Sequence, residues 1–469
     1  MPLPVLQVEQ MHEWEQATWA TGQTEAEVIR QVGWVIAERL RSLTAPQASI
    51  LILAGKGHNG DDARAAATFL TDRRVQLLSI TDPEPALMAL ANQLATSPAW
   101  IVDGLFGIGL NRPLSEAWQQ FIATVNAAQI PVLALDVPSG LNATTGENFG
   151  ACIQATLTLT VGAPKAGLLA AAAVSWVGRL EVAAEVGLIP CPCPAEVNWT
   201  VPGDFAGYPP LRPVEGHKGA FGHVAIIAGS QGYHGAAILA TRGAQRAQPG
   251  LATLLIQENV FHPVAAQLQS AMVQVWAPEV TLPENTTTAL IGPGLAALEI
   301  AENMRKYLRH LWRKAPFPVV ADASALGWLE SHLPMSVCRV MTPHPGEAAR
   351  MLQTNTAHVQ ADRLGALRRL SKLFGGAWVV LKGHETLIGR AEGKVYVNSS
   401  GNPHLAQGGS GDLLGGFIAG LLAQSTLQRD VEKLLRYAVW QHGGAADRLQ
   451  SRSTNWTIED LANELGNAR

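Results

Sequence analysis

Short apolar runs alternate with longer helical patterns along this chain, and this alternation constrains the fold more than any other feature. In the first 190 residues the apolar runs are Ser49–Ala54, Val75–Ile80, Trp100–Val102, Pro131–Leu135 and Thr156–Val161. Near-continuous runs of Leu and β-branched residues, spaced by helices, are typical of parallel strands that are buried on both faces. The sequence therefore predicts an α/β fold with a parallel sheet covered by helices on both sides.

A second set of apolar runs begins downstream of a proline-rich segment. These runs are His223–Ala228, Leu251–Ile256, Met272–Trp276, Ala289–Ile291, Pro318–Ala321 and Trp378–Leu381. Seven prolines lie from Pro190 to Pro213, a density that neither a helix interior nor a central strand tolerates. We therefore predict two α/β domains, residues 1–210 and 211–469, each with a site at the carboxyl ends of its strands.

The composition argues against several classes of partner. Hydrophobic residues make up 47% of the chain and charged residues 15%, and the formal net charge is −4. This balance gives no electrostatic reason to expect a nucleic acid or an anionic membrane as partner. The sequence shows no signal peptide, no apolar run long enough to span a bilayer and no disulfide framework among its four cysteines. We therefore expect a cytoplasmic protein.

Polar residues follow four predicted strands in the N-terminal half. The first loop reads GKGHNGDDA from Gly55 to Ala63, and glycines between a strand and a helix suit a nucleotide phosphate. If the strands are neighbours, four side chains converge at one edge of the sheet: Asn59, Asp103, Asp136 and Ser139. Their oxygens suit a hard cation, and Lys165 beside an Asp would form an acid–base pair. The alternative is that Asp103 and Asp136 only cap the segments that follow them.

The C-terminal half contains a stretch that combines a phosphate cradle with an acid. Residues 401–416 read GNPHLAQGGSGDLLGG, so that glycines precede an apolar helix and Asp412 stands at its start. Successive N–H groups can converge on a phosphate at a helix N-terminus, and Asp412 can take a proton there. The alternative is a tight turn capped by Ser410 or Asp412. No GxxxxGK[ST] motif occurs, which disfavours a P-loop kinase.

The N-terminal motifs resemble the epimerase domain of the NAD(P)H-hydrate repair proteins, whose loops typically read GxGNNGGDG, VDALFGTG and DIPSG. The resemblance covers residues 1–190 and implies a Rossmann-like three-layer sandwich. It implies potassium ligands at Asn59, Asp103 and Ser139, and a catalytic pair of Asp136 and Lys165. It implies substrate contacts at His58, Asn59, Gly60, Asp61, Asp62, Gly107, Ile108, Gly109, Leu110, Asn111, Arg112, Pro113 and Asp136.

Three residues depart from this family pattern. His58 stands where Asn is usual, and Asp61 and Ala63 stand where Gly is usual. The Asp61 carboxylate adds negative charge where the phosphates of a dinucleotide would bind, a repulsion of about 1 kcal/mol or more. We therefore expect epimerase activity that is weakened by this loop.

The C-terminal motifs HKGAFG, GYHGAA, GPG, TPHPGE, LKGHET and NPHLAQGGSGD resemble the ribokinase-like superfamily. Within it, residues 211–469 are most similar to the ATP- or ADP-dependent NAD(P)H-hydrate dehydratases. The resemblance implies nucleotide contacts at Lys382, Gly383, His384, Glu385, Thr386 and Gly411. It implies hydrate contacts at Ala236, Gly294, His344 and Asp412, with Asp412 as the catalytic residue.

Together the two resemblances imply an enzyme that repairs hydrated nicotinamide cofactors. The N-terminal domain would interconvert the R and S epimers of NADHX and NADPHX with K⁺, and the C-terminal domain would dehydrate the S epimer with ADP or ATP and Mg²⁺. We also expect a homo-oligomer. The alternative is a ribokinase-like kinase of a vitamin or sugar, with an N-terminal module that binds a nucleotide without catalysis.

Overall fold

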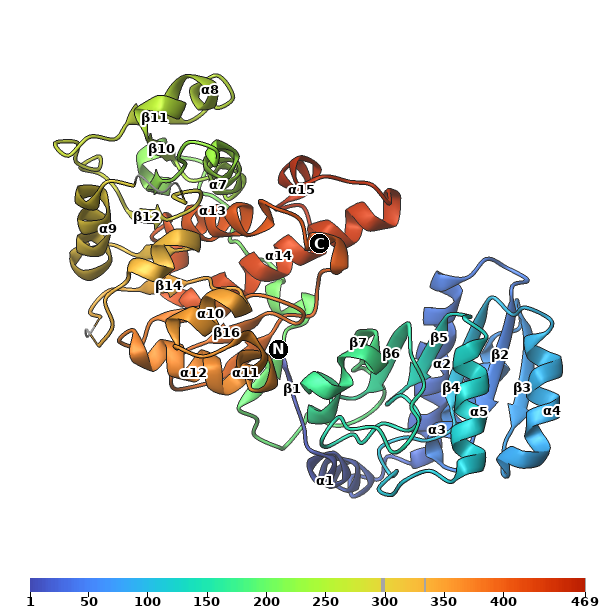
Figure 1. Ribbon diagram of the computed structural model, residues 1–469. Helices are drawn as coiled ribbons and strands as arrows, with labels where there is room; N and C mark the ends of the chain where they lie inside the picture. Colours follow the sequence, from blue (N-terminus) through green and yellow to red (C-terminus); the bar gives the residue numbers. More distant parts are fainter. Residues whose placement is uncertain (297–299, 333–334, 469) are drawn as a thin grey trace. The chain divides into compact units, whose positions relative to one another are not determined.

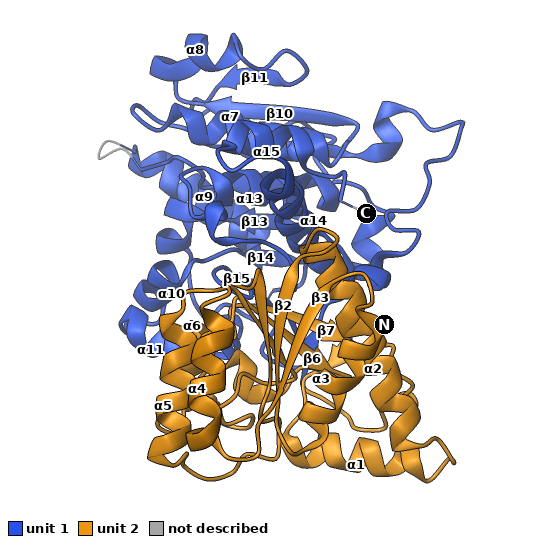
Figure 2. Cartoon of the chain, turned by 90° about the vertical axis from the view of Figure 1, so that its right-hand side faces the viewer, with its two compact units in different colours: residues 1–2, 197–469 blue, residues 3–196 orange. Residues whose placement is uncertain are grey.

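The computed structural model describes residues 1–296, 300–332 and 335–468, which form two compact units (Figure 2). The N-terminal unit comprises residues 3–196, and the C-terminal unit comprises residues 1–2 and 197–469. The division lies upstream of the boundary expected at residues 210 and 211. The reason is that Val197–Trp199 forms strand β8 of the C-terminal unit and Phe205 packs on Tyr437 of that unit, with ring centroids 5.5 Å apart.

The N-terminal unit contains a parallel sheet in the order β3-β2-β4-β5-β6-β7. Its strands are β2 (Ser49–Ala54), β3 (Arg74–Ser79), β4 (Trp100–Gly104), β5 (Val132–Leu135), β6 (Leu157–Val161) and β7 (Arg179–Ala183). Each apolar run predicted as a strand in this half is a strand, whereas β7 was not predicted. A two-residue strand, β1 (Leu3–Pro4), precedes the helices of this unit.

Helices cover both faces of this sheet, as Figure 2 shows for the orange unit. The helices are α1 (Val8–Trp19), α2 (Glu25–Leu43), α3 (His58–Phe69), α4 (Pro83–Leu94), α5 (Glu116–Ala127) and α6 (Val174–Val177). Alternate residues of a strand point to opposite faces. Accordingly, Ile50 and Ile52 of β2 pack in the core with α2 and α3, whereas Leu51 and Leu53 pack in a separate core with α4 and α5. The predicted three-layer sandwich is confirmed.

The C-terminal unit is built on a larger sheet in the order β8-β17-β16-β15-β14-β13-β12-β9-β10-β11. Its further strands are β9 (His223–Ile227), β10 (Leu251–Ile256), β11 (Met272–Val275), β12 (Thr288–Ile291), β13 (Val319–Ala321), β14 (Arg339–Met341), β15 (Trp378–Leu381), β16 (Leu387–Gly389) and β17 (Val395–Val397). In this sheet order, the strands from β15 to β11 run parallel to one another. Strand β16 is antiparallel to both of its neighbours, β15 and β17. The six predicted runs are strands, and the short strands β8, β14, β16 and β17 were not predicted.

Two layers of helices enclose this sheet (Figure 1). The helices are α7 (His234–Arg246), α8 (Phe261–Ala265), α9 (Glu302–Lys314), α10 (Pro345–Met351), α11 (Thr356–Ala361), α12 (Arg363–Leu373), α13 (Ser410–Leu422), α14 (Val431–Arg452) and α15 (Ile458–Glu464). Helices α7, α13 and α14 share a core with alternate strand residues, whereas α9 packs on β13 and α12 on β15. In the described part of the chain, no helix combines the length and apolar character needed to cross a bilayer.

Glycines fix the position of α13, the helix that begins with the predicted reaction centre. A Cβ atom added at Gly243 of α7 would lie 2.1 Å from the Leu413 carbonyl oxygen, and one at Gly416 would lie 1.9 Å from the Ala240 carbonyl oxygen. Only residues without a side chain permit so close a backbone approach. The α7–α13 contact therefore sets where Asp412 stands.

Candidate active sites

The start of α13 combines a left-handed turn with an acid. Gly409, the residue that precedes the helix, has a φ of 95°, a conformation that favours glycine. The helix then begins at Ser410, and Asp412 lies in its first turn. The first backbone N–H groups of a helix have no partner within the helix and attract anions. The geometry matches the predicted cradle with its attached carboxylate.

A buried ion pair faces this helix start. Lys382 follows β15, and its ammonium nitrogen lies 2.8 Å from Oδ1 of Asp322 and 3.9 Å from Oε2 of Glu347. A Cβ atom added at Gly411 would lie 3.1 Å from the same nitrogen. Burial alone would lower the pKa of Lys382, but the charges of Asp322 and Glu347 outweigh it and raise the pKa. A permanent positive charge is thus held beside the first turn of α13.

Asp412 is set up to accept a proton near neutral pH. Burial, followed by the negative charge of Asp322, raises the pKa of Asp412 to about 6, against the opposing charge of Lys382. A base with a pKa slightly below the working pH is largely ionised and still has a useful affinity for a proton. The site can therefore deprotonate a hydroxyl while it stabilises negative charge.

His344 is the N-cap residue of α10. Its Nδ1 accepts hydrogen bonds from the N–H groups of Gly346 and Glu347, at 3.0 and 3.3 Å, and the His344 N–H donates to Oε2 of Glu347 at 2.8 Å. Burial lowers the pKa of His344, and the two N–H groups that point at Nδ1 leave that nitrogen without a proton. Because Nδ1 accepts, the ring proton lies on Nε2, which remains the donor for a ligand.

The predicted nucleotide contacts after β15 share one tight turn. Gly383 has a φ of 128° and Glu385 one of 51°, and the Thr386 hydroxyl donates to the Gly383 carbonyl at 3.0 Å. Arg363 of α12 donates to the carbonyl oxygens of Leu381 and His384 and so holds the turn in place. Burial raises the pKa of Glu385 to about 7, although Arg363 opposes it.

Ala236 and Gly294, two predicted hydrate contacts, are neighbours. Gly294 follows β12 with a φ of 64°, and a Cβ atom there would lie 2.8 Å from Cβ of Ala236. The Ser230 hydroxyl donates to the Gly294 carbonyl at 2.7 Å. The loops after β9 and β12 are thereby joined at the start of α7.

Asp322 and His442 escaped the sequence analysis, and Glu347 entered it only as the last residue of the TPHPGE motif, without a role of its own. Asp322 directly follows the run Val319–Ala321, which is the signal that identified Asp136, and it could have been found in that way. Nε2 of His442 lies 3.1 Å from the Ser410 carbonyl oxygen, and burial lowers the pKa of His442 to about 4. His442 lies in the middle of α14, where nothing in the sequence indicates a contact with α13.

In the N-terminal unit, Asp103, Ser139 and Asn59 form a compact group of oxygens. Oδ1 and Oδ2 of Asp103 accept from the Ser139 hydroxyl at 2.6 Å and from its N–H at 2.8 Å. Asn59 donates through Nδ2 to the carbonyls of Phe106 and Leu135, while its buried Oδ1 has no partner among the described residues. Burial raises the pKa of Asp103 to about 6, although its hydrogen bonds act in the opposite direction.

This group fits a monovalent cation. A buried acceptor without a donor costs free energy unless a ligand satisfies it, and Oδ1 of Asn59 is such an acceptor. Carboxylate, amide and hydroxyl oxygens are ligands that hard cations prefer. The residues for which potassium ligation was expected are therefore adjacent and chemically suitable.

Asp136 and Lys165 form a buried pair close to that group. Lys165 donates to Oδ1 of Asp136 at 2.5 Å, to the Thr160 hydroxyl at 3.0 Å and to the Val161 carbonyl at 2.7 Å. Asp136 has a φ of 62°, which is uncommon for a residue other than Gly and is often found at functional sites. The structure thus brings together the two residues expected as the catalytic pair.

The loop expected at Gly55–Ala63 is shorter than predicted, because α3 already begins at His58. Asp61 forms an ion pair with Arg64 at 2.8 Å, and Nδ1 of His58 lies 2.7 Å from Oε1 of Glu25. The Asp61 charge that we expected to repel a dinucleotide is therefore partly offset by Arg64. Asn59, Gly60 and Asp62 lie in the same first turns of α3.

The second predicted substrate loop, residues 107–113, begins between the two polar groups. A Cβ atom added at Gly107 would lie 3.4 Å from Cβ of Asn59 and 3.7 Å from Oδ2 of Asp136. Ile108 packs on the small core of Leu6, Met11 and Trp14. The other members are Gly109, Leu110, Asn111, Arg112 and Pro113, and of these only Leu110 is not exposed.

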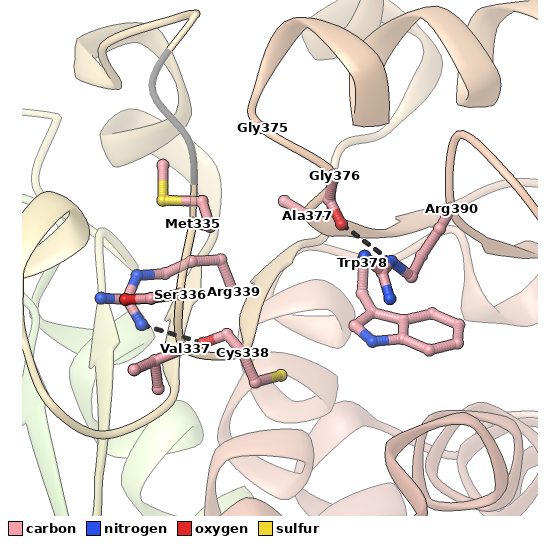
Figure 3. Close-up of a pocket in the computed structure, with 10 residues that line it drawn as sticks. All are labelled: Met335, Ser336, Val337, Cys338, Arg339, Gly375, Gly376, Ala377, Trp378 and Arg390. Atoms are coloured by element: carbon pink, nitrogen blue, oxygen red, sulfur yellow. Dashed lines mark hydrogen bonds between the residues drawn. The ribbon is translucent and has the colours of Figure 1, made fainter.

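A hollow in the C-terminal unit lies at the opposite end of the strands from Lys382. Arg339 begins β14 and Trp378 begins β15, and both line this hollow with Arg390 (Figure 3). The Arg339 guanidinium donates to the carbonyls of Trp312 and Ala315 at the end of α9. It therefore caps that helix, and the hollow is separate from the candidate active site.

Comparison with known proteins gives a family match for each of the two units. The family model described as NAD(P)H-hydrate dehydratase matches residues 224–467, more than half of the chain, and that described as YjeF-related protein N-terminus matches residues 82–167. The C-terminal unit resembles a ribokinase-like superfamily protein of Enterococcus faecalis, with 28% identity and a TM-score of 0.50 over 58% of this chain and 95% of that one. Its fold is therefore ribokinase-like.

Relatives that span both units define the family. The bifunctional NAD(P)H-hydrate repair enzyme Nnr of Gloeobacter violaceus is 35% identical over 460 residues, which cover 88% of this chain and 87% of the relative. The ADP/ATP-dependent NAD(P)H-hydrate dehydratase of Bacillus subtilis, co-crystallized with ATP/Mg²⁺, is 30% identical with a TM-score of 0.50 over 55% of this chain and 92% of that one. The chain belongs to the family of bifunctional NAD(P)H-hydrate repair enzymes.

Proposed function

We propose that this chain repairs hydrated NADH and NADPH, with an epimerase in the N-terminal unit and an ADP- or ATP-dependent dehydratase in the C-terminal unit. The observation that carries the proposal is the position of the Lys382 ammonium, which is paired with Asp322 and lies beside the first turn of α13, where Asp412 stands. A buried acid and a fixed cation at a helix N-terminus suit phosphoryl transfer to a hydroxyl. Family membership over both units supports the same assignment.

The substrate of the dehydratase carries a hydroxyl on the ring carbon next to the ring nitrogen, where hydroxide is a poor leaving group. Asp412 accepts the hydroxyl proton while the hydroxyl oxygen bonds to the terminal phosphorus of ADP or ATP and the nucleotide leaves. The N–H groups of Gly409, Gly411 and Asp412, together with Lys382, stabilise charge on the phosphoryl oxygens. The ring nitrogen then expels phosphate, and loss of a proton from the neighbouring carbon restores NADH or NADPH.

The predicted binding residues divide between the two ligands of this site. The nucleotide contacts are Lys382, Gly383, His384, Glu385, Thr386 and Gly411, and the hydrate contacts are Ala236, Gly294, His344 and Asp412. In the described residues no group of three His, Cys, Asp or Glu side chains is arranged to hold a metal ion. Mg²⁺ would therefore be held chiefly by the nucleotide phosphates, as is common for this ion, and would neutralise their charge.

The N-terminal unit acts on the other epimer. Asp136 and Lys165 assist the departure and return of water at the hydroxylated carbon, which passes through a ring iminium and inverts the centre. K⁺ would be held by Asn59, Asp103 and Ser139, where it would supply a fixed positive charge. Substrate would contact α3 from His58 to Asp62 and the loop from Gly107 to Pro113. We further propose a cytoplasmic homo-oligomer.

The test is a repair assay with separated epimers. The S epimer with ADP or ATP should yield NADH, followed by its absorbance, and the R epimer should do so only after epimerisation. Asp136→Ala should slow repair of the R epimer and leave that of the S epimer unchanged. Equal slowing of both epimers would contradict the division of labour, and failure with the S epimer would contradict the dehydratase.

A further inference from the structure

The proposed epimerisation needs a group that donates a proton to the departing hydroxyl, and this inference rests on that proposed activity. Lys165 has three N–H groups, and three acceptors already occupy them: Asp136, Thr160 and Val161. Lys165 is also 1% exposed. No N–H of Lys165 is therefore left to protonate a ligand unless this network breaks.

Asp136 is equally unsuited to the role of acid. Its Oδ1 accepts from Lys165 at 2.5 Å, from the Thr160 hydroxyl at 3.1 Å and from the Val161 N–H at 3.1 Å. A carboxylate that already accepts from three donors is placed to receive a proton. Another residue therefore has to give one.

Asp62 lies in the first turns of α3, the helix that also carries Asn59. It stands three residues after Asn59 in α3, so the two side chains emerge on the same face of the helix. The Asn59 side chain reaches the Phe106 carbonyl at 2.8 Å and flanks Gly107, whose other neighbour is Oδ2 of Asp136. Asp62 and Asp136 are close enough for their charges to interact.

The charges around Asp62 are all negative, and each has its own partner. The carboxylates that act on Asp62 belong to Asp136, Asp61, Glu15 and Glu25. Asp136 and Asp61 form ion pairs with Lys165 and Arg64, whereas carboxylate oxygens of Glu15 and Glu25 lie 3.2 and 2.7 Å from ring nitrogens of His12 and His58. The Asp62 carboxyl itself has no hydrogen-bond or ion-pair partner in the described part of the chain. Burial, followed by these charges, raises the pKa of Asp62 well above its ordinary value.

We propose that Asp62 is the general acid of the N-terminal site and Asp136 its general base. Asp136 accepts from three donors and Asp62 from none within the ranges that the structure describes, and two carboxyl groups in such different surroundings are the usual arrangement for this division. The Asp62 proton goes to the hydroxyl oxygen, the carbon–oxygen bond breaks, water leaves and the ring nitrogen lone pair forms the iminium. Water then adds to the opposite face of that carbon and gives its proton to Asp136. Exchange with solvent returns the proton to Asp62 before the next turnover in this direction.

The experiment measures repair of the R epimer by the full chain with ATP across pH 5 to 9, for the wild type, Asp62→Asn and Glu84→Gln, which alters an exposed carboxylate of α4. Loss of a general acid lowers kcat by roughly 10²- to 10⁴-fold. We expect that loss for Asp62→Asn, together with loss of the alkaline limb of the pH profile, along which wild-type activity falls as Asp62 ionises. Glu84→Gln, the control, lies outside the expected substrate contacts, so it should stay within a few-fold of the wild type and keep that limb.

Two further measurements separate this role from other effects. Because Asp62 has no partner, Asp62→Asn should not lower the unfolding temperature of the N-terminal unit, whereas a purely structural role would lower it. Repair of the S epimer should be unchanged in every variant. If the wild type converts the R epimer and Asp62→Asn keeps the alkaline limb, Asp62 is not the acid. If the wild type does not convert the R epimer, the proposed epimerase itself is contradicted, and this role with it.

Discussion

The Lys382 ammonium nitrogen lies 2.8 Å from Oδ1 of Asp322, a carboxylate that is only 1% exposed, next to the first turn of α13. The two residues come from the ends of β15 and β13, which are separated in the sheet by β14. This ion pair holds a positive charge where a phosphoryl group would be transferred. Asp322 is thus a positioning residue for Lys382, and it also helps to raise the pKa of Asp412.

Asp322→Asn should destabilise the C-terminal unit, because it leaves the Lys382 charge without its nearest partner. Removal of one member of a buried ion pair costs about 3–5 kcal/mol. Unfolding in urea should show a lower midpoint, and the double variant Asp322→Leu with Lys382→Met should recover much of the loss. Glu330→Gln, which removes an exposed ion pair with Arg313, is the control and should change little. If Asp322→Asn and Glu330→Gln lowered the urea midpoint equally, the structural role of the Asp322–Lys382 ion pair would be contradicted.

Asp412→Asn should remove dehydratase turnover without removing nucleotide binding. Loss of a general base lowers kcat by roughly 10²- to 10⁴-fold, whereas Lys382 and the turn after β15 remain. Since the pKa of Asp412 is raised to about 6, wild-type repair of the S epimer should increase as pH rises from 5 to 7 and Asp412 ionises. Steady-state rates and nucleotide titration by calorimetry check both points. Full turnover by Asp412→Asn would remove this residue from the mechanism.

The strands could be predicted because apolar runs of four or more residues have few alternatives to a buried parallel sheet. The short strands β14 and β17 escaped prediction: β14 begins with Arg339, and the three residues of β17 are hard to distinguish from the background of a hydrophobic chain. The loop motifs indicated Asp412, Lys382, Asp136 and Lys165, but not the partners that set their charge states. The pairing of Asp322 with Lys382, and the isolation of Asp62, depend on which strand ends and helices lie together in space. Such proximity has no local signal in the sequence.

Potassium should stabilise the N-terminal unit in a pH-dependent way. A cation at Asn59 and Asp103 favours the ionised carboxylate, and burial raises the pKa of Asp103 to about 6. Protons therefore compete with the cation as pH falls through 6, so KCl should raise the unfolding temperature more at pH 7.5 than at pH 5. NaCl at equal ionic strength is the control. Asn59→Leu, which removes the unpaired Oδ1, should abolish the potassium-specific rise, and an unchanged rise would contradict this site.

The Asp61–Arg64 pair should determine how well the N-terminal site accepts a substrate with phosphates. Arg64→Met leaves the Asp61 carboxylate without the partner that lies 2.8 Å away, so its negative charge acts fully on the substrate. An unscreened like charge near a protein surface costs about 1 kcal/mol or more, which is at least a several-fold rise in KM. We expect this rise for the R epimer at low salt, with kcat little changed. The double variant Asp61→Asn with Arg64→Met removes both charges and should return KM to near the wild-type value. A double variant that binds as weakly as Arg64→Met would show that Arg64 contacts the substrate directly instead of neutralising Asp61.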